Sequence, residues 1–229
     1  MSPKELVGVV VYGSERVGKT SLITKYIDGS FNKDDYSQSV GIQMYKKRGV
    51  RFQVTSASNE KSSEPETGST TDIDPGGRQL QSHTDVDIVI LEATDTGCIY
   101  ARRDWVYIKM SVIILAYSTT DPRTLANARS VLERARELQS KAKIFLVGLL
   151  ADCEEKRAVS FSQGQEVAAE FEVDFRELSA AVDGDRVNGL FADVAPFLVL
   201  RDKSVKRTSA ADLSVWRKIW KAVMPWSSS

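Results

Sequence analysis

The chain has 229 residues, 42% of them hydrophobic, which is enough to bury the core of one domain with appendages. Its 31 Lys and Arg residues balance 31 Asp and Glu residues, so the net charge of zero excludes a general affinity for nucleic acid. Two cysteines are too few for a disulfide framework, and the N-terminal apolar run covers only residues 6–12. We therefore expect a soluble, cytoplasmic protein.

Short apolar segments alternate with helical patterns along the chain. Strands are expected at residues 6–12, 86–91, 112–117 and 144–148, where β-branched residues form short runs. Helices are expected at residues 21–27, 125–138 and 163–171, where apolar residues recur at helical spacing. This alternation predicts an α/β fold with a doubly wound, mostly parallel sheet, whose ligand site lies at the carboxyl ends of the strands.

Residues 55–84 interrupt this alternation. The segment is rich in Ser, Thr, Glu, Gly and Pro and has almost no large apolar side chains. Such a composition cannot bury enough surface to offset the entropy of ordering, so we expect a disordered insertion. The single histidine, His83, lies in it with no candidate co-ligand nearby, which favours a solvated side chain over a metal ligand.

A glycine-rich turn follows the first predicted strand. The sequence GSERVGKT, from Gly13 to Thr20, matches G-x-x-x-x-G-K-[ST] at every specified position. Its glycines allow backbone N–H groups to point at phosphate oxygens, Lys19 would reach the outer phosphates, and the hydroxyl of Thr20 would ligate Mg²⁺. The expected phosphate-binding residues are Gly13, Glu15, Arg16, Val17, Gly18, Lys19, Thr20 and Ser21.

Segments beyond this loop carry a family resemblance. GKTSLITKYIDGSF and YSQSVGIQM resemble the start of a Ras-superfamily small GTPase of the Rab and Ras branches, and ILAYSTTDPRTL, IFLVGLLADCEE and FRELSAAVDGDRVNGLF follow in family order. The resemblance covers about residues 5–200. It implies a Ras-like G domain over residues 1–200 that binds GTP or GDP with Mg²⁺ and recruits effector proteins through a switch surface.

The resemblance also assigns the residues around the guanine base. Phe31 would pack against the base, although a core phenylalanine is the alternative. Of the family motif N/T-K-x-D only Asp152 remains, because Leu149 and Leu150 replace the first two residues. Asp152 would accept hydrogen bonds from guanine, the alternative being an ordinary turn residue. The family segment S-A-K appears as Ser179, Ala180 and Ala181, in which the N–H of Ala180 would serve the guanine oxygen. A guanine site of reduced affinity is expected.

The two switch segments depart from the family pattern. Ser39 stands where a threonine closes over Mg²⁺. In the second switch, either Glu92 replaces the aspartate on the magnesium side, or Asp95-Thr96-Gly97 forms a shortened motif. In both alignments Thr96 or Cys98 stands near the place of the water-orienting glutamine, so poor hydrolysis is expected.

Glu15 replaces a small residue beside the terminal phosphate. Pointing inward, it would repel the phosphate and obstruct an arginine finger; pointing outward, or neutralised by Arg16, it would have little effect.

The C-terminal residues 201–229 have a different character. Residues 212–224 form a predicted basic helix with Trp216 and Trp220 on one stripe, which suits an anionic membrane surface, a partner groove or the chain's own domain. No cysteine follows Cys153, so C-terminal prenylation is not expected.

Two classes of function fit these features. One is an atypical GTP-binding switch with slow or impaired hydrolysis that acts in trafficking or signalling and binds partners through its switch surface and C-terminal helix. The other is a pseudo-GTPase scaffold, in which nucleotide is absent or permanently bound.

Overall fold

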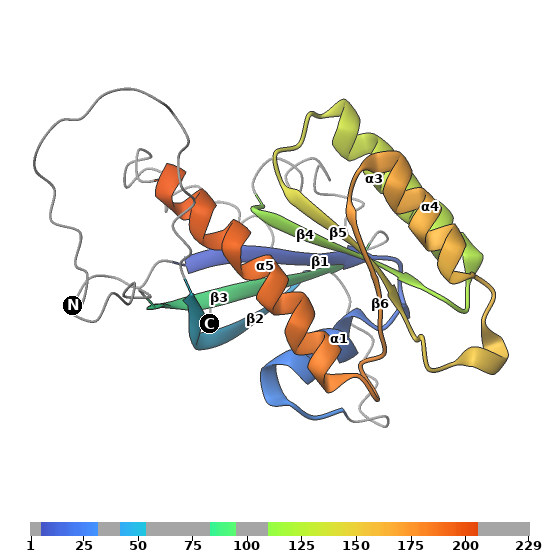
Figure 1. Cartoon of the computed structure of the whole chain (residues 1–229), viewed down its shortest axis with the longest axis horizontal. Helices are drawn as coiled ribbons and strands as arrows, with labels where there is room; N and C mark the ends of the chain where they lie inside the picture. The colour runs from blue at the N-terminus through green and yellow to red at the C-terminus, as the bar shows by residue number, and fades with distance from the viewer. Residues whose placement is uncertain (1–5, 32–41, 54–82, 95–109, 206–229) are drawn as a thin grey trace, which may run out of the picture.

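The computed structural model describes residues 6–31, 42–53, 83–94 and 110–205 (Figure 1). Within these ranges the strands form one sheet in the order β2-β3-β1-β4-β5-β6. All neighbouring strands are parallel except β2, which runs antiparallel to β3. The strands are β1 (Leu6–Gly13), β2 (Ile42–Gln53), β3 (His83–Thr94), β4 (Val112–Ser118), β5 (Lys143–Leu149) and β6 (Asp174–Glu177). The predicted α/β fold with a doubly wound, mostly parallel sheet is confirmed.

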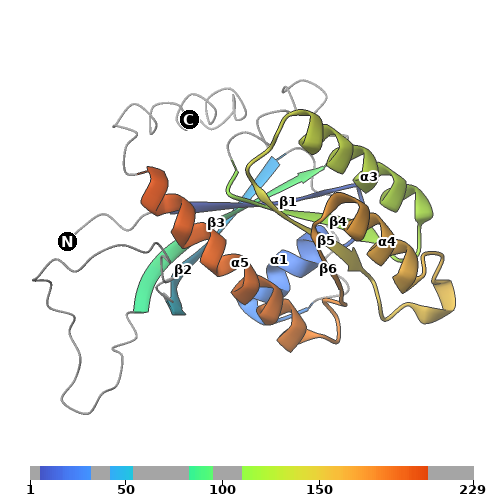
Figure 2. The same cartoon turned by 45° about the horizontal axis from the view of Figure 1, so that its top comes forward.

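Helices cover both faces of this sheet (Figures 1 and 2). One face carries α1 (Lys19–Asp28) and α5 (Gly184–Val205), and the other carries α3 (Pro122–Glu137) and α4 (Phe161–Phe171). A short 3₁₀ helix, η1 (Glu154–Lys156), follows β5. The three helices expected from the sequence are present. Local capping explains where two of them begin. Asp121 caps α3 directly before a first-turn proline, and Ser160 forms a capping box with Gln163 at the start of α4.

The central strand β1 is buried on both faces, as its continuous apolar run predicts. Val9 and Val11 face the layer of α1 and α5, whereas Val10 and Tyr12 face the layer of α3 and α4. Each fully buried aliphatic side chain contributes about 1.5–3 kcal/mol relative to an exposed one. The two cores therefore hold β1, and with it the loop that follows, in a fixed position.

Besides the short η1, three elements were not among the expected ones. β6 is four residues long, and its residues are exposed or only partly buried, so it has no apolar run to mark it. β2 carries consecutive basic residues and a β-bulge between Lys47 and Val50. α5 contains Pro196, which breaks the usual helical pattern, and it continues to Val205, past the expected domain boundary at residue 200. The predicted helix at 212–224 lies outside the described residues.

The β2–β3 hairpin determines where the predicted insertion leaves the sheet. Ile42 pairs with Ala93 at the phosphate-loop end, whereas Gln53 pairs with His83 ten residues farther along β3, roughly 33 Å away. His83 therefore belongs to β3, and its expected place inside the insertion is wrong, as is that of the next residue, Thr84. Cross-strand pairing extends β3 beyond its apolar run, and most of the predicted insertion lies outside the described residues.

Candidate nucleotide-binding site

The predicted phosphate loop connects β1 to α1 at the carboxyl edge of the sheet. Gly13 has a φ of 154°, and a Cβ there would lie 2.2 Å from the backbone oxygen of Ala116 on β4. Gly18 has a φ of 100° and precedes the first residue of α1, while Arg16 also has a positive φ of 61°. The motif glycines are thus required by the close strand and by a left-handed backbone. The side chains of Glu15 and Arg16 are exposed.

Lys19 lies inside this loop. Its side chain is 3% exposed, and Nζ donates hydrogen bonds to the backbone oxygens of Gly13 at 3.0 Å and Ser14 at 2.6 Å. On α3, Asn127 Nδ2 donates to the Ser14 hydroxyl at 3.1 Å, which ties the loop to that helix. A buried ammonium group held by neutral carbonyls places positive charge where an anionic group would enter.

Thr20, the next residue on α1, contacts a carboxylate from β3. Thr20 Oγ1 donates to Glu92 Oε1 at 2.6 Å, and Glu92 is only 2% exposed. Tyr45 on β2 lies 2.9 Å from the other carboxylate oxygen. Burial and the charge of Glu92 raise the pKa of the Tyr45 hydroxyl, which therefore remains a donor. A hydroxyl and a carboxylate are the hard oxygen donors that Mg²⁺ prefers, so these residues fit the predicted ion.

The loop after β5 approaches the phosphate loop with apolar side chains. A Cβ at Gly18 would lie 3.7 Å from Leu149 Cδ1 and 3.8 Å from Leu150 Cδ2. Leu150 has a φ of 62°, which is unfavourable for a bulky side chain. Asp152 follows in an exposed position. The two leucines that replace the family residues therefore lie beside Gly18 of the phosphate loop.

Thr119, directly after β4, holds this loop and was not among the predicted site residues. It is fully buried, its N–H donates to Leu149 O at 3.0 Å, and its Oγ1 lies 3.1 Å from Leu149 O and 2.9 Å from Leu150 O. A single threonine after a strand has no distinguishing sequence signal, because its role depends on a contact thirty residues away along the chain.

The turn after β6 satisfies two of its own backbone donors. The N–H of Ser179 donates to Asp183 Oδ2 at 2.8 Å, and the N–H of Ala181 donates to the Ser179 hydroxyl at 3.1 Å. Ala180, whose N–H the resemblance assigns to guanine, lies between them.

Phe31 lies shortly after the end of α1 and is 38% exposed. The alternative of a core phenylalanine is therefore wrong, because a core side chain would be buried. The other predicted switch residues, Ser39, Asp95, Thr96, Gly97 and Cys98, lie outside the described residues.

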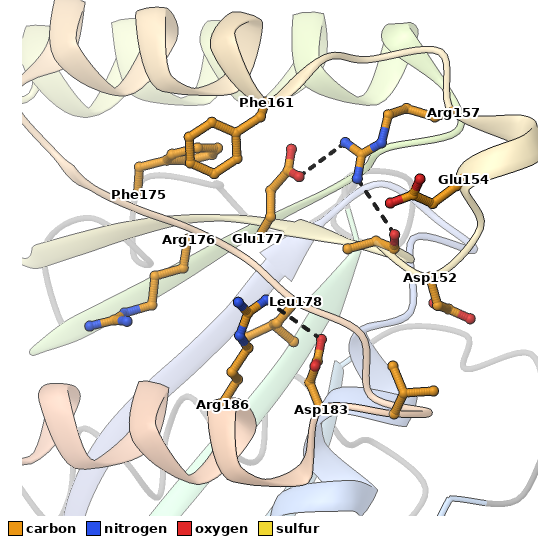
Figure 3. A pocket seen from close by; sticks show the side chains of 12 residues that line it. Asp152, Glu154, Arg157, Phe161, Phe175, Arg176, Glu177, Leu178, Asp183 and Arg186 are labelled. Carbon is orange, nitrogen blue, oxygen red and sulfur yellow. Dashed lines mark hydrogen bonds and ion pairs between the residues drawn. The ribbon is translucent and has the colours of Figure 1, made fainter.

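A pocket of about 470 Å³ lies beside the loop of Asp152, at the edge of β6 between α4 and α5 (Figure 3). Its three arginines are already paired: Arg157 with Glu177 at 3.0 Å, Arg186 with Asp183 at 4.0 Å, and Arg176 with Asp193. Neither Lys19 nor Thr20 lines it. This pocket therefore neighbours the loop predicted to recognise the base and is separate from Lys19 and Thr20, two of the predicted phosphate-loop residues.

Tyr117 on β4 packs between the sheet and α4 at this edge, next to Gly148 and Gly164. Its hydroxyl donates to Glu177 Oε1 at 3.1 Å, and burial together with the charge of Glu177 raises the pKa of Tyr117. A Cβ at Gly148 would lie 2.7 Å from the Tyr117 hydroxyl, and one at Gly164 would lie 2.3 Å from it. The two glycines thus make room for the tyrosine, which sequence reasoning did not identify.

In the described part of the chain, no helix is both long and apolar enough to cross a membrane. The acidic, cysteine and histidine side chains described there form no group of three or more able to hold a metal ion, so an ion beside Thr20 would depend on additional oxygen ligands.

Comparisons with known proteins agree with this geometry. The model of the Ras family matches residues 65–198, and that of the Roc (Ras of Complex) domain of DAPkinase matches residues 8–67. Ras-related protein SEC4 of Candida albicans is 36% identical over 95 residues, which are 41% of this chain and 44% of SEC4. The match thus spans less than half of that relative.

Two other relatives match over more of their length. GTP-binding protein drn-1 of Caenorhabditis elegans is 27% identical over 190 residues, covering 80% of this chain and 71% of drn-1. Ras-related protein RabC of Dictyostelium discoideum is 25% identical over 184 residues, covering 79% of this chain and 78% of RabC. Because the Ras family model matches more than half of a chain that also has this fold and phosphate loop, the protein belongs to the Ras family of small GTPases, with Rab-like relatives.

Proposed function

We propose that this protein is a GTP-binding molecular switch that binds GTP or GDP with Mg²⁺ and hydrolyses GTP slowly. The observation that carries this proposal is the pair of neighbouring side chains on α1: Lys19 buried within the phosphate loop, and Thr20 bonded to the buried carboxylate of Glu92 at 2.6 Å. A buried cation and an oriented hydroxyl side by side suit a phosphate–magnesium ligand.

Each of these groups has a defined task toward the nucleotide. The ammonium of Lys19, which now donates to the carbonyl oxygens of Gly13 and Ser14, would bind the outer phosphates when the nucleotide is present. Glu92 accepts a hydrogen bond from Thr20 Oγ1, which would leave a lone pair of this hydroxyl available to the ion. Bound Mg²⁺ would neutralise phosphate charge at this point. Of the two alignments of the second switch, this geometry favours the one that places Glu92 on the magnesium side.

Base recognition is expected to be weaker than in typical relatives. Asp152 would accept the guanine hydrogen bonds and Phe31 would cover the base, with Ala180 serving the guanine oxygen. Leu149 and Leu150 contribute no polar group to the base. Since a lost buried hydrogen bond costs about 1 kcal/mol, each missing contact lowers affinity by roughly fivefold.

Slow hydrolysis rests on two sequence features. Thr96 stands at the position of the water-orienting glutamine and has no amide to hold the attacking water. Glu15 adds bulk to the phosphate loop, and in the inward orientation its side chain would obstruct an arginine finger and repel the terminal phosphate. With slow hydrolysis, the protein would remain in its GTP form and keep partner proteins bound to its switch surface; the basic C-terminal helix is a second proposed contact, with a partner or a membrane surface.

Release and identification of the nucleotide bound to freshly purified protein tests the proposal. We expect mainly GTP in the wild-type protein and none in Lys19→Ala. Lys143→Ala is the matched control, because Lys143 pairs with Asp174 at the start of β5, whereas the phosphate loop lies at the carboxyl end of β1. Bound GDP would contradict slow hydrolysis but keep the switch. A wild-type protein that is empty and binds no added nucleotide with Mg²⁺ would overturn the proposal and leave the scaffold function.

A further inference from the structure

Tyr45 lies on β2, outside every motif found in the sequence, and contacts the carboxylate that orients Thr20. Its hydroxyl lies 2.9 Å from Glu92 Oε2, while Thr20 Oγ1 donates to Oε1 of the same group at 2.6 Å. The carboxylate is therefore held at both oxygens, by β2 at one and by α1 at the other.

The strand register explains why these groups meet. Gln43 is the direct cross-strand partner of Glu92, and Tyr45 is the partner of Ile90. Side chains two residues apart on a strand point to the same face, so Gln43, Tyr45 and Glu92 all face α1. The ring of Tyr45 packs against the core on this face, which fixes the direction of its hydroxyl.

The Tyr45 hydroxyl donates its hydrogen bond to Glu92. The hydroxyl also lies 2.7 Å from Gln43 Oε1, but it has one proton, and a buried carboxylate is the stronger acceptor. An amide can rotate its nitrogen into the position of its oxygen, so Gln43 can donate to the tyrosine oxygen instead. The result is a chain of hydrogen bonds in which Gln43 donates to Tyr45 and Tyr45 donates to Glu92. Glu92 also accepts a hydrogen bond from the Thr20 hydroxyl.

Glu92 has particular need of such a restraint. Where family members carry aspartate, glutamate has one more rotatable bond, and an unrestrained carboxylate would sample orientations that do not accept the Thr20 proton. We propose that Tyr45 is a positioning residue for Mg²⁺: its hydrogen bond fixes Glu92 so that the Thr20 hydroxyl presents a lone pair to the ion. This inference rests on the proposed function, which supplies the nucleotide that the ion accompanies.

Tyr45→Phe tests the inference, because it removes the hydroxyl and keeps the ring. The readout is the release rate of fluorescent GDP at a series of buffered Mg²⁺ concentrations. We expect the Mg²⁺ concentration that gives half-maximal protection to rise about tenfold, as is typical for outer-shell metal partners. Release in EDTA stays at the wild-type rate, because Tyr45 acts only through the ion. In a Glu92→Gln background, Tyr45→Phe adds no further shift.

Tyr117→Phe is the matched control, since it removes another buried tyrosine hydroxyl that donates to a glutamate, Glu177, on the opposite face of the sheet. It should lower the urea midpoint without changing the Mg²⁺ dependence. An unchanged Mg²⁺ dependence in Tyr45→Phe, or an equal shift in Tyr117→Phe, overturns the inference while leaving the proposed function intact. A wild-type protein that retains no nucleotide at any Mg²⁺ concentration overturns both.

Discussion

Thr119→Val tests whether one buried hydroxyl holds the base-recognition loop in place. Valine has nearly the shape of threonine, so at this 0% exposed position the change removes the hydroxyl without opening a cavity. Both carbonyls that the hydroxyl contacts keep a backbone donor, because Leu149 O still accepts from the N–H of Thr119 and Leu150 O from the N–H of Cys153, each at 3.0 Å. The loss is therefore one net hydrogen bond, and no buried group is left unsatisfied.

The loss of one net hydrogen bond sets the size of the expected change in stability and in GDP release. One net hydrogen bond contributes about 1 kcal/mol to the free energy of unfolding, whereas an unsatisfied buried group would cost up to about 3 kcal/mol. In a domain of this length, 1 kcal/mol lowers Tm by roughly 2–4 °C. If the same ~1 kcal/mol is lost from the stability of the loop that carries Asp152, GDP release should become about fivefold faster.

Two assays on the same variants separate stability from loop positioning. Urea unfolding of nucleotide-free protein measures stability. Release of fluorescent GDP in excess unlabelled nucleotide measures how well the loop is positioned. The control is Thr120→Val, which removes a neighbouring hydroxyl that lies 2.8 Å from the Ser118 hydroxyl. The Ser118 side chain also accepts from the N–H of Thr120. Unchanged GDP release in Thr119→Val, or equal acceleration in Thr120→Val, would show that the Thr119 hydroxyl does not position the loop.

Three further predictions concern single residues. Gly164→Ala places a carbon 2.3 Å from the Tyr117 hydroxyl and should lower the free energy of unfolding, measured in urea, by about 1–3 kcal/mol. Adding Tyr117→Phe removes that hydroxyl and should restore part of the lost stability. If the double variant is no more stable than Gly164→Ala, the clash is not with the Tyr117 hydroxyl. Gly13→Ala sets a carbon 2.2 Å from the Ala116 carbonyl oxygen, so the purified variant should carry no nucleotide; normal nucleotide content would contradict the packing argument. Asp121→Ala removes the cap of α3 and should cost about 1 kcal/mol in urea unfolding at neutral pH. A hydrogen bond from Arg123 lowers the pKa of Asp121, so the contribution of Asp121 is present above the unfolded pKa and disappears as pH falls through the folded one; a cost that does not decline as the pH is lowered below the unfolded pKa would contradict this.

Local signals in the sequence determined the elements that carry the phosphate site. The apolar run of β1, the glycine loop and the pattern of α1 lie next to one another in the chain, so their arrangement needs no long-range information. Turn and capping chemistry is local in the same way, which is why α3 and α4 were also predictable. These features were sufficient to predict the fold class and the phosphate-binding loop.

Long-range pairing decided the rest. Glu92, Tyr45 and Thr20 come from three elements, and only the register of β2 on β3 and the packing of α1 bring their side chains together. The same register places His83 in a strand despite its polar surroundings, because backbone hydrogen bonding does not require apolar side chains. Thr119 acquires its role in the same way, from a loop that follows the next strand. The sequence by itself predicted which residues would bind phosphate, and tertiary structure decided which side chains lie in contact with them.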